Sequence, residues 1–127
     1  MANPISEEIK TGTVGELLVQ LRLLQYGVQA AQPLKDSGND LIALKEFAIR
    51  CVQVKTTTND VPAWPPEDKL YHLLAVVRLE GDGHDLVLDR STVYLLSREE
   101  VRLATRSWPG LEEFRLNERR IKALFRE

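Results

Sequence analysis

Three polar side chains stand at the ends of two apolar runs in the middle of the chain. The runs are DLIAL (40–44) and FAIRCVQVK (47–55), and the side chains are those of Asp40, Gln53 and Lys55. Carboxylate and amide oxygens are hard ligands that suit Mg²⁺ or Mn²⁺, ions that bind few protein groups and keep several waters. An ammonium group beside them can orient a water nucleophile or offset charge that develops on a phosphate. These residue types therefore indicate a centre that hydrolyses phosphodiesters.

The two runs are predicted to be the strands of a hairpin. With residues 45–46 as the connection, Leu44 lies opposite Phe47, and this register places Asp40 opposite Cys51. Side chains alternate between the two faces of a strand, so one face should have a polar end and an apolar interior. The polar end would hold Asp40, Cys51, Gln53 and Lys55, and the interior would hold Ile42, Leu44, Phe47 and Ile49.

A helix is predicted ahead of the hairpin, over about residues 14–26. Thr11 or Thr13 could cap it, and Glu16 stands three residues after Thr13 in capping-box spacing. For Glu16, a structural role as the capping partner and a functional role are both open. Four leucines at helical spacing would give this helix a buried stripe: Leu17, Leu18, Leu21 and Leu24.

The remaining elements complete a layered α/β fold. Residues 28–34 suit a first strand, and Pro62, Pro65 and Pro66 break up the segment that follows the hairpin. The run LLAVV (73–77) is apolar enough to imply a strand covered on both faces. Further predictions are strands over 73–80, 86–88 and 92–96, a helix capped by Ser97 with Glu100 in capping-box position, and a last helix capped by Asn117. We expect residues 1–127 to form a single domain.

Composition limits the broad class of the protein. The net charge is −2, with 17 Lys and Arg against 19 Asp and Glu, so the chain lacks the strong positive charge of many nucleic-acid-binding domains. The sequence has no apolar run of about 20 residues, the length that a membrane span needs. The start of the chain lacks a signal-peptide pattern, and we therefore expect a cytoplasmic protein. Cys51 is the one cysteine, which excludes an internal disulfide.

The order of these motifs resembles the PD-(D/E)XK nuclease superfamily, in a variant with Gln-x-Lys. The segments TGTVGELLVQLRLLQYG (11–27), DSGNDLIAL (36–44) and CVQVKTTT (51–58) are similar to the branch that contains archaeal Holliday-junction resolvases and certain intron-encoded homing endonucleases. The resemblance implies a restriction-endonuclease-like three-layer core. Its expected order is a helix, a three-stranded β meander, a crossover, further strands and C-terminal helices.

The resemblance also implies a function and a role for each residue. Asp40 would be the central metal ligand, Gln53 would occupy the position usually held by Glu or Asp, Lys55 would be the motif lysine, and Glu16 would complete the metal site from the helix. Residues near the DNA backbone would be Lys35, Thr56, Thr57 and Thr58, the threonines just past the strand. The expected protein is a DNA endonuclease that uses Mg²⁺ or Mn²⁺. Because symmetric cutting of two strands calls for two active sites, we expect a homodimer or a higher symmetric oligomer.

Other interpretations of the same residues remain open. Asp40 follows Gly38 and Asn39 and could simply close a turn, and Lys55 could be a solvated strand end. Trp64, between prolines, could stack on a base or pack its loop against the core. The chain could therefore be a weak or inactive nuclease-fold protein that binds nucleic acid or regulates, or an α/β module that binds other proteins.

Overall fold

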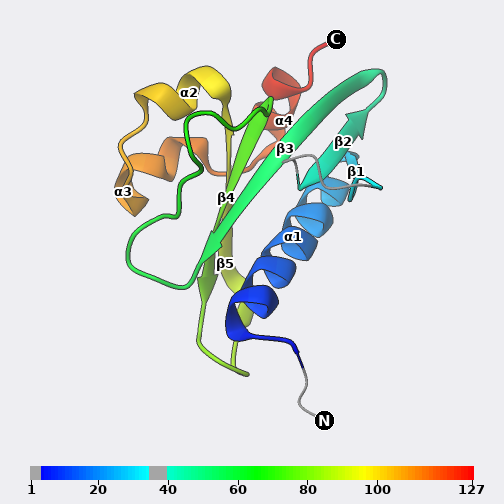
Figure 1. Cartoon of the computed structure of the whole chain (residues 1–127). Helices are drawn as coiled ribbons and strands as arrows, with labels where there is room; N and C mark the ends of the chain where they lie inside the picture. Colours follow the sequence, from blue (N-terminus) through cyan, green and yellow to red (C-terminus); the bar gives the residue numbers. More distant parts are fainter. Residues whose placement is uncertain (1–3, 35–39) are drawn as a thin grey trace.

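The structure is a computed structural model that describes residues 4–34 and 40–127. Its elements, shown in Figure 1, are α1 (Glu7–Gln25), β1 (Gln29–Ala31), β2 (Leu41–Lys45), β3 (Ala48–Thr57), β4 (Leu73–Glu80), β5 (Val87–Ser97), α2 (Arg98–Leu103), α3 (Trp108–Leu111), η1 (Glu112–Phe114) and α4 (Glu118–Leu124). Within these described residues, we find no helix with the length and apolar character needed to cross a membrane.

The five strands form one sheet in the order β1-β2-β3-β4-β5. The first three strands pair antiparallel as a meander, β3 and β4 run parallel, and β5 returns antiparallel to β4. Parallel neighbours need a long connection, which here is the segment 58–72. The predicted fold class is confirmed: a helix, a meander, a crossover, further strands and C-terminal helices form an α/β fold. The two strands predicted over 86–88 and 92–96 are one continuous strand, β5.

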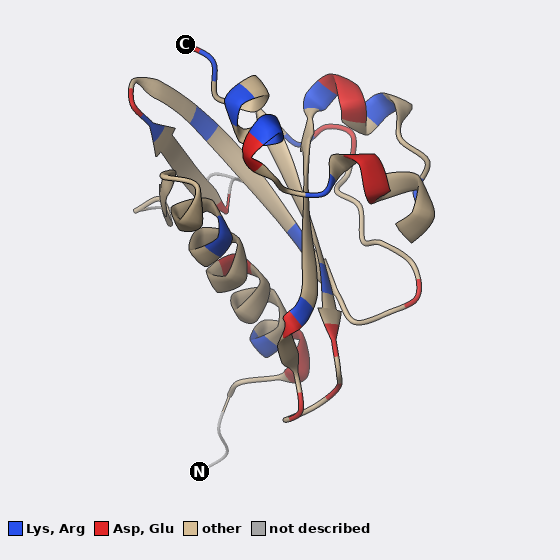
Figure 2. Ribbon diagram, turned by 180° about the vertical axis from the view of Figure 1, so that it is seen from behind, with Lys and Arg blue, Asp and Glu red and all other residues tan. Residues whose placement is uncertain are grey.

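Two apolar clusters pack on opposite faces of the sheet, which gives the fold three layers. One cluster joins α1 and α4 to the sheet, and the other joins the sheet to α2, α3 and the crossover. Figures 1 and 2 show α1 on one side of the strands and α2 with α3 on the other. Residues 73–77 of β4 are at most 2% exposed, as expected for a strand covered on both faces.

Helix α1 begins earlier than predicted and buries a different stripe. Ser6 Oγ accepts a hydrogen bond from the Ile9 amide and caps the helix, so Thr11 and Thr13 lie inside it. Leu18 is buried as predicted, but the other three leucines of the predicted stripe are exposed: Leu17, Leu21 and Leu24. The buried face is Gly15, Leu18, Val19 and Leu23, because the sheet covers the side of the helix that contains the small glycine.

The β2–β3 hairpin has a register two residues away from the predicted one. Its turn is Glu46-Phe47, with Lys45 opposite Ala48, and Glu46 has the left-handed φ of 56°. This conformation is uncommon for a residue other than glycine, so the sequence does not signal the turn. A shift of two residues preserves the face of every side chain. The hairpin face is therefore as predicted, although Asp40 now precedes the pair Leu41–Val52 and so lies next to Gln53 rather than opposite Cys51.

The apolar end of this hairpin face is open to solvent, contrary to the prediction of an apolar interior. The exposed fractions are 41% for Ile42, 37% for Leu44, 88% for Phe47 and 57% for Ile49. The layer formed by α2, α3 and the crossover lies over the other end of β3, and the hairpin projects past it in Figure 1. Gln53, farther along the same face, is buried instead.

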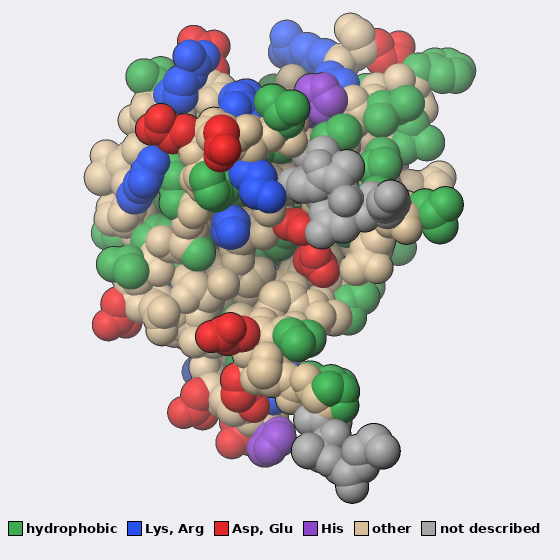
Figure 3. Space-filling view, viewed as in Figure 1, with side chains coloured by type: hydrophobic (Ala, Val, Ile, Leu, Met, Phe, Trp, Pro, Cys, Tyr) green, Lys and Arg blue, Asp and Glu red, His purple; other side chains and the backbone are tan. Residues whose placement is uncertain are grey.

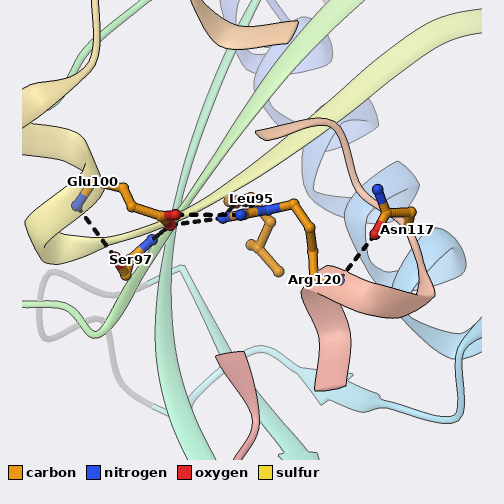
Figure 4. Close-up of polar contacts among 5 residues, drawn as sticks. All are labelled: Leu95, Ser97, Glu100, Asn117 and Arg120. Carbon is orange, nitrogen blue, oxygen red and sulfur yellow. Dashed lines mark hydrogen bonds and ion pairs between the residues drawn. The ribbon is translucent and has the colours of Figure 1, made fainter. Parts of the chain in front are cut away.

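A polar cluster fastens the C-terminal helix to the end of β5 (Figure 4). Arg120 donates from Nη2 to Glu100 Oε1 at 2.6 Å and from Nη1 to Glu100 Oε2 at 3.2 Å, and its Nε and Nη2 also donate to the Leu95 carbonyl. Ser97 and Glu100 form the predicted capping box of α2, and Asn117 caps α4 as predicted. Burial raises the pKa of Glu100, but hydrogen bonds from Arg120 and Ser97 and the charge of Arg120 outweigh it and hold that pKa below its usual value.

Helix α1 and strand β3 lie in close contact at Gly15. A Cβ atom at this position would lie 1.8 Å from Thr56 Oγ1, a distance at which the helix or the strand must move. Gly15 is thus required for space, and it sets the distance between the helix that carries Glu16 and the strand that carries Gln53 and Lys55.

We predict that Gly15→Ala lowers the free energy of unfolding by about 1–3 kcal/mol, because the added methyl overpacks the helix–strand contact. Gly12→Ala is the matched control, since a Cβ there meets nothing within 4 Å. The control should leave stability unchanged or raise it by up to about 1 kcal/mol, because alanine favours a helix interior. Urea unfolding measures both changes, and equal effects of the two substitutions would contradict the close contact.

Candidate functional site

Asp40 and Gln53 are in direct contact at the start of β2. The Asp40 amide donates to the Val52 carbonyl at 3.1 Å, which continues the β2–β3 ladder by one residue. Asp40 Oδ2 accepts hydrogen bonds from Gln53 Nε2 and from the Val54 amide, both at 2.8 Å. Both bonds end on the same oxygen, so Asp40 Oδ1 remains available for another ligand within the described part of the chain.

The side-chain amide of Gln53 has a fixed orientation. An ionised carboxylate only accepts hydrogen bonds, so the amide must present its NH₂ group to Asp40 and turn Oε1 away. Gln53 is 5% exposed, and across residues 4–34 and 40–127 no hydrogen-bond donor reaches its Oε1. An unpaired buried carbonyl costs about 1–3 kcal/mol and calls for an explanation such as a cation.

Lys55 follows Gln53 on the same face of β3, two residues along. It lies opposite Val76 of β4 and is half-buried. Its ammonium group makes no hydrogen bond or ion pair with any residue that the structure describes. The structure thus places an ammonium group on the face that carries the Asp40–Gln53 pair.

Glu16 lies on α1, which packs against the face of β3 opposite to the side chains of Gln53 and Lys55. Glu16 Oε2 accepts a hydrogen bond from Gln32 Nε2 at 3.4 Å. Its predicted capping role is wrong, because Ser6 caps α1 and residue 16 is in the middle of the helix. Its role as a carboxylate of the metal site stays a prediction.

The residues predicted to lie near DNA have different environments. Thr56 and Thr57 belong to β3, so the expectation that all three threonines follow the strand is wrong. Thr56 faces α1 at Gly15, and Thr57 is buried with its Oγ1 accepting from the Asn59 amide at 3.0 Å. Thr58 follows the strand and is exposed. Lys35 lies outside the described residues.

The available donors fit a hard cation bound by few protein groups. Asp40 Oδ1 and Gln53 Oε1 are oxygen donors of the kind that Mg²⁺ and Mn²⁺ prefer, and such ions keep several waters. Within the described residues, no group of three or more His, Cys, Asp and Glu side chains is suited to a metal. One carboxylate and one amide would supply less negative charge than a pair of carboxylates, and weaker binding of the ion follows.

Sequence reasoning assigned no role to three arginines on the side of the sheet that carries Gln53 and Lys55. Arg98, Arg102 and Arg106 line a cavity together with Trp64 and Tyr71. The four-residue spacing of the arginines was the available signal, because such spacing places side chains on one side of a helix. Helix α2 ends at Leu103, so only two of the three arginines are helical.

The comparisons with known proteins support the fold. No known protein-family profile matches the chain, and no curated protein sequence is similar to it. Among solved structures, the chain is similar to a bacterial homing endonuclease, I-Ssp6803I, with a TM-score of 0.59 and 15% sequence identity. The match covers 94% of this chain and 91% of that chain. At this identity the similarity shows a shared fold.

We predict that Gln53→Glu makes stability depend on divalent ions. In EDTA the new carboxylate would face that of Asp40, and their repulsion should lower the free energy of unfolding by about 1–3 kcal/mol. Millimolar Mn²⁺ or Mg²⁺ should restore most of this loss. Thermal unfolding with and without the ion measures the effect, and Gln25→Glu, on the exposed surface of α1, is the charge-matched control. The same response to ions in both variants would rule out a cation at Gln53.

Proposed function

We propose that this protein is a metal-dependent endonuclease that hydrolyses phosphodiester bonds of DNA with Mg²⁺ or Mn²⁺. The observation that carries the proposal is the buried, unpaired Oε1 of Gln53, held by Asp40 on the face that also carries Lys55. An unpaired oxygen and a carboxylate can hold a divalent cation, and an ammonium group beside them can offset charge on a phosphate, so the three suit a phosphodiester-hydrolysing centre. The homing-endonuclease fold of the similar structure is compatible with this activity.

Each residue has a chemical task in this proposal. Asp40 and Gln53 would hold the cation through their side-chain oxygens, and the Val54 amide keeps the Asp40 carboxylate in place. When bound, the ion would polarise a phosphoryl oxygen and make the phosphorus easier for water to attack. The Lys55 ammonium orients that water or offsets the negative charge that develops on the phosphate. Glu16 supports the site from α1.

We predict that Asp40→Asn and Lys55→Ala each lower the rate of DNA cleavage by at least about 100-fold, because each removes a group that acts on the reacting phosphate. The assay uses supercoiled plasmid, linear duplex, single-stranded DNA and a four-way junction, each with Mg²⁺ or Mn²⁺. Lys122→Ala, which removes an exposed lysine paired with Glu118, is the matched control and should cut normally.

Two other results would be decisive in the cleavage assay. Cleavage that survives in both site variants would come from another site or from a contaminant. If the folded wild-type protein cuts none of these substrates, the weak or inactive nuclease-fold interpretation replaces the enzymatic one.

We further propose that two copies associate through α1. Leu17, Leu21 and Leu24 are 54–60% exposed and follow the four- and three-residue spacing of a helix-pairing seam. Between residues 11 and 25, α1 has only Glu16 and Arg22 as charged residues. A two-fold axis across this stripe would pair it with itself, and the resulting dimer would provide one site for each DNA strand.

We predict that the wild-type protein is a dimer in solution and that Leu21→Lys makes it a monomer, because the substitution would bury an unpaired ammonium group at the seam. Sedimentation equilibrium gives the mass of each. Leu103→Lys is the control, since Leu103 is 81% exposed on α2, away from α1. A monomeric wild type, or a dimer that persists in Leu21→Lys, would exclude this interface.

A further inference from the structure

A cavity of about 580 Å³ lies between the crossover segment 58–72 and α2. Its volume is within the range of roughly 300–1,000 Å³ that is usual for small-molecule sites. Two aromatic rings and three guanidinium groups line it: Trp64, Tyr71, Arg98, Arg102 and Arg106. Among the residues that line it, Glu67 supplies the carboxylate. The cavity is therefore aromatic and carries net positive charge.

Contacts with α2 and α3 fix the position of the crossover segment that forms one wall of the cavity. Arg98 Nη1 donates to the Lys69 carbonyl at 2.7 Å, and its guanidinium lies 4.6 Å from the centre of the Tyr71 ring. Trp108 Nε1 donates to the Asn59 carbonyl at 3.3 Å and holds the start of the same segment. Because both ends of the segment are tied to the α2–α3 side, the cavity does not need a ligand to form it.

Two of the three arginines are free to bind a ligand. Arg106 lies over the Trp64 ring at 5.1 Å from its centre, and the other face of a guanidinium in this position can stack on a base. Arg102 is exposed and makes no hydrogen bond, ion pair or ring contact within the described residues. Arg98 is engaged with backbone carbonyls, so it shapes the wall, while Arg102 can meet a phosphate and Arg106 can stack on a base.

The cavity is on the side of the sheet that carries the proposed catalytic residues. Lys55 lies opposite Val76, and Val76 belongs to the apolar cluster against which Trp64 and Tyr71 pack. The segment that forms the cavity wall begins directly after β3, the strand of Gln53 and Lys55. Figure 3 shows Lys and Arg side chains over α2 and this segment, in the upper left, together with hydrophobic side chains and with Asp and Glu.

We propose that this cavity binds an unpaired nucleotide of the DNA substrate, with its base stacked on the Trp64–Arg106 pair and its phosphate at Arg102. Stacking on aromatic rings and arginine planes suits every base and requires that the base be free of its partner strand. A duplex keeps its bases stacked inside and offers only phosphates to the cavity. The proposal rests on the proposed function and assigns to it substrates that contain a single-stranded segment.

The test measures binding in EDTA, where no cleavage occurs. Fluorescence anisotropy compares a labelled 15-nucleotide oligothymidylate with a 15-base-pair duplex (both lengths about the span of one small domain on DNA). We expect the single strand to bind at least about fivefold more tightly than the duplex. Arg102→Gln with Arg106→Gln should weaken single-strand binding by about tenfold or more and remove the preference. Arg119→Gln removes the charge of an exposed arginine on α4 and is the control for the loss of positive charge. This variant should still prefer the single strand to the duplex.

Trp64→Leu separates stacking from charge, because it removes a ring and leaves every arginine. It should weaken single-strand binding by roughly 5–100-fold, the effect of losing one base–aromatic stack, and leave duplex binding unchanged. If circular dichroism shows that this variant does not fold, the double variant Arg102→Gln with Arg106→Gln provides the test of the proposal. Equal binding of the two DNA forms by the wild type, or an equal loss for both forms in the arginine variant, would overturn the proposal.

The outcomes also separate this proposal from the proposed nuclease activity. A single-strand preference without any cleavage in Mg²⁺ or Mn²⁺ would retain the nucleotide site and reject the enzyme. Cleavage that requires Asp40 and Lys55, but without a single-strand preference in binding, would retain the enzyme and reject the nucleotide site.

Discussion

The parallel pairing of β3 with β4 is the constraint on which the rest of the structure depends. Antiparallel neighbours can be joined by a tight turn. Between parallel neighbours, the chain must run back from the end of one strand to the level at which the next strand begins. Three prolines prevent this return segment from forming a long helix, so it crosses the sheet as an irregular wall. That wall covers the end of β3 that carries Gln53 and leaves the hairpin end uncovered, and it forms one side of the arginine-lined cavity.

At the site itself, one carboxylate organises the surrounding polar groups. Asp40 takes hydrogen bonds from the Gln53 side chain and the Val54 amide through a single oxygen, which fixes its own position and the direction of the neighbouring amide. An amide at position 53 avoids the repulsion that a second acid would bring, so the pair is stable without a cation. An amide in place of an acid also lowers the negative charge that is available to hold a cation. In the proposed metal site, the amide at position 53 would therefore favour stability without the ion over affinity for the ion.

Much of this arrangement could be predicted because it follows from short-range rules. The period of two along a strand placed Asp40, Gln53 and Lys55 on one face, and that assignment survives the error in register because the shift is two residues. The turn at Glu46-Phe47 uses a left-handed glutamate, for which the sequence has no signal. The start of α1 was missed because serine and threonine are comparable caps and both stood nearby. Which leucines of α1 are buried depends on how closely Gly15 approaches Thr56, a contact between segments that are far apart in sequence.

The C-terminal cluster at β5 also closes one border of the sheet. β5 is an edge strand, and its outward carbonyls at Val93 and Leu95 accept from the Leu116 amide and from Arg120. An edge whose acceptors are already used cannot recruit a strand from another molecule, which is how many β-proteins avoid aggregation. The opposite border is β1, a strand of three residues that offers little backbone for pairing. Pairing with a strand of another chain is therefore blocked where β5 is covered and limited by the shortness of β1, so contacts between copies of this protein would be made by side chains.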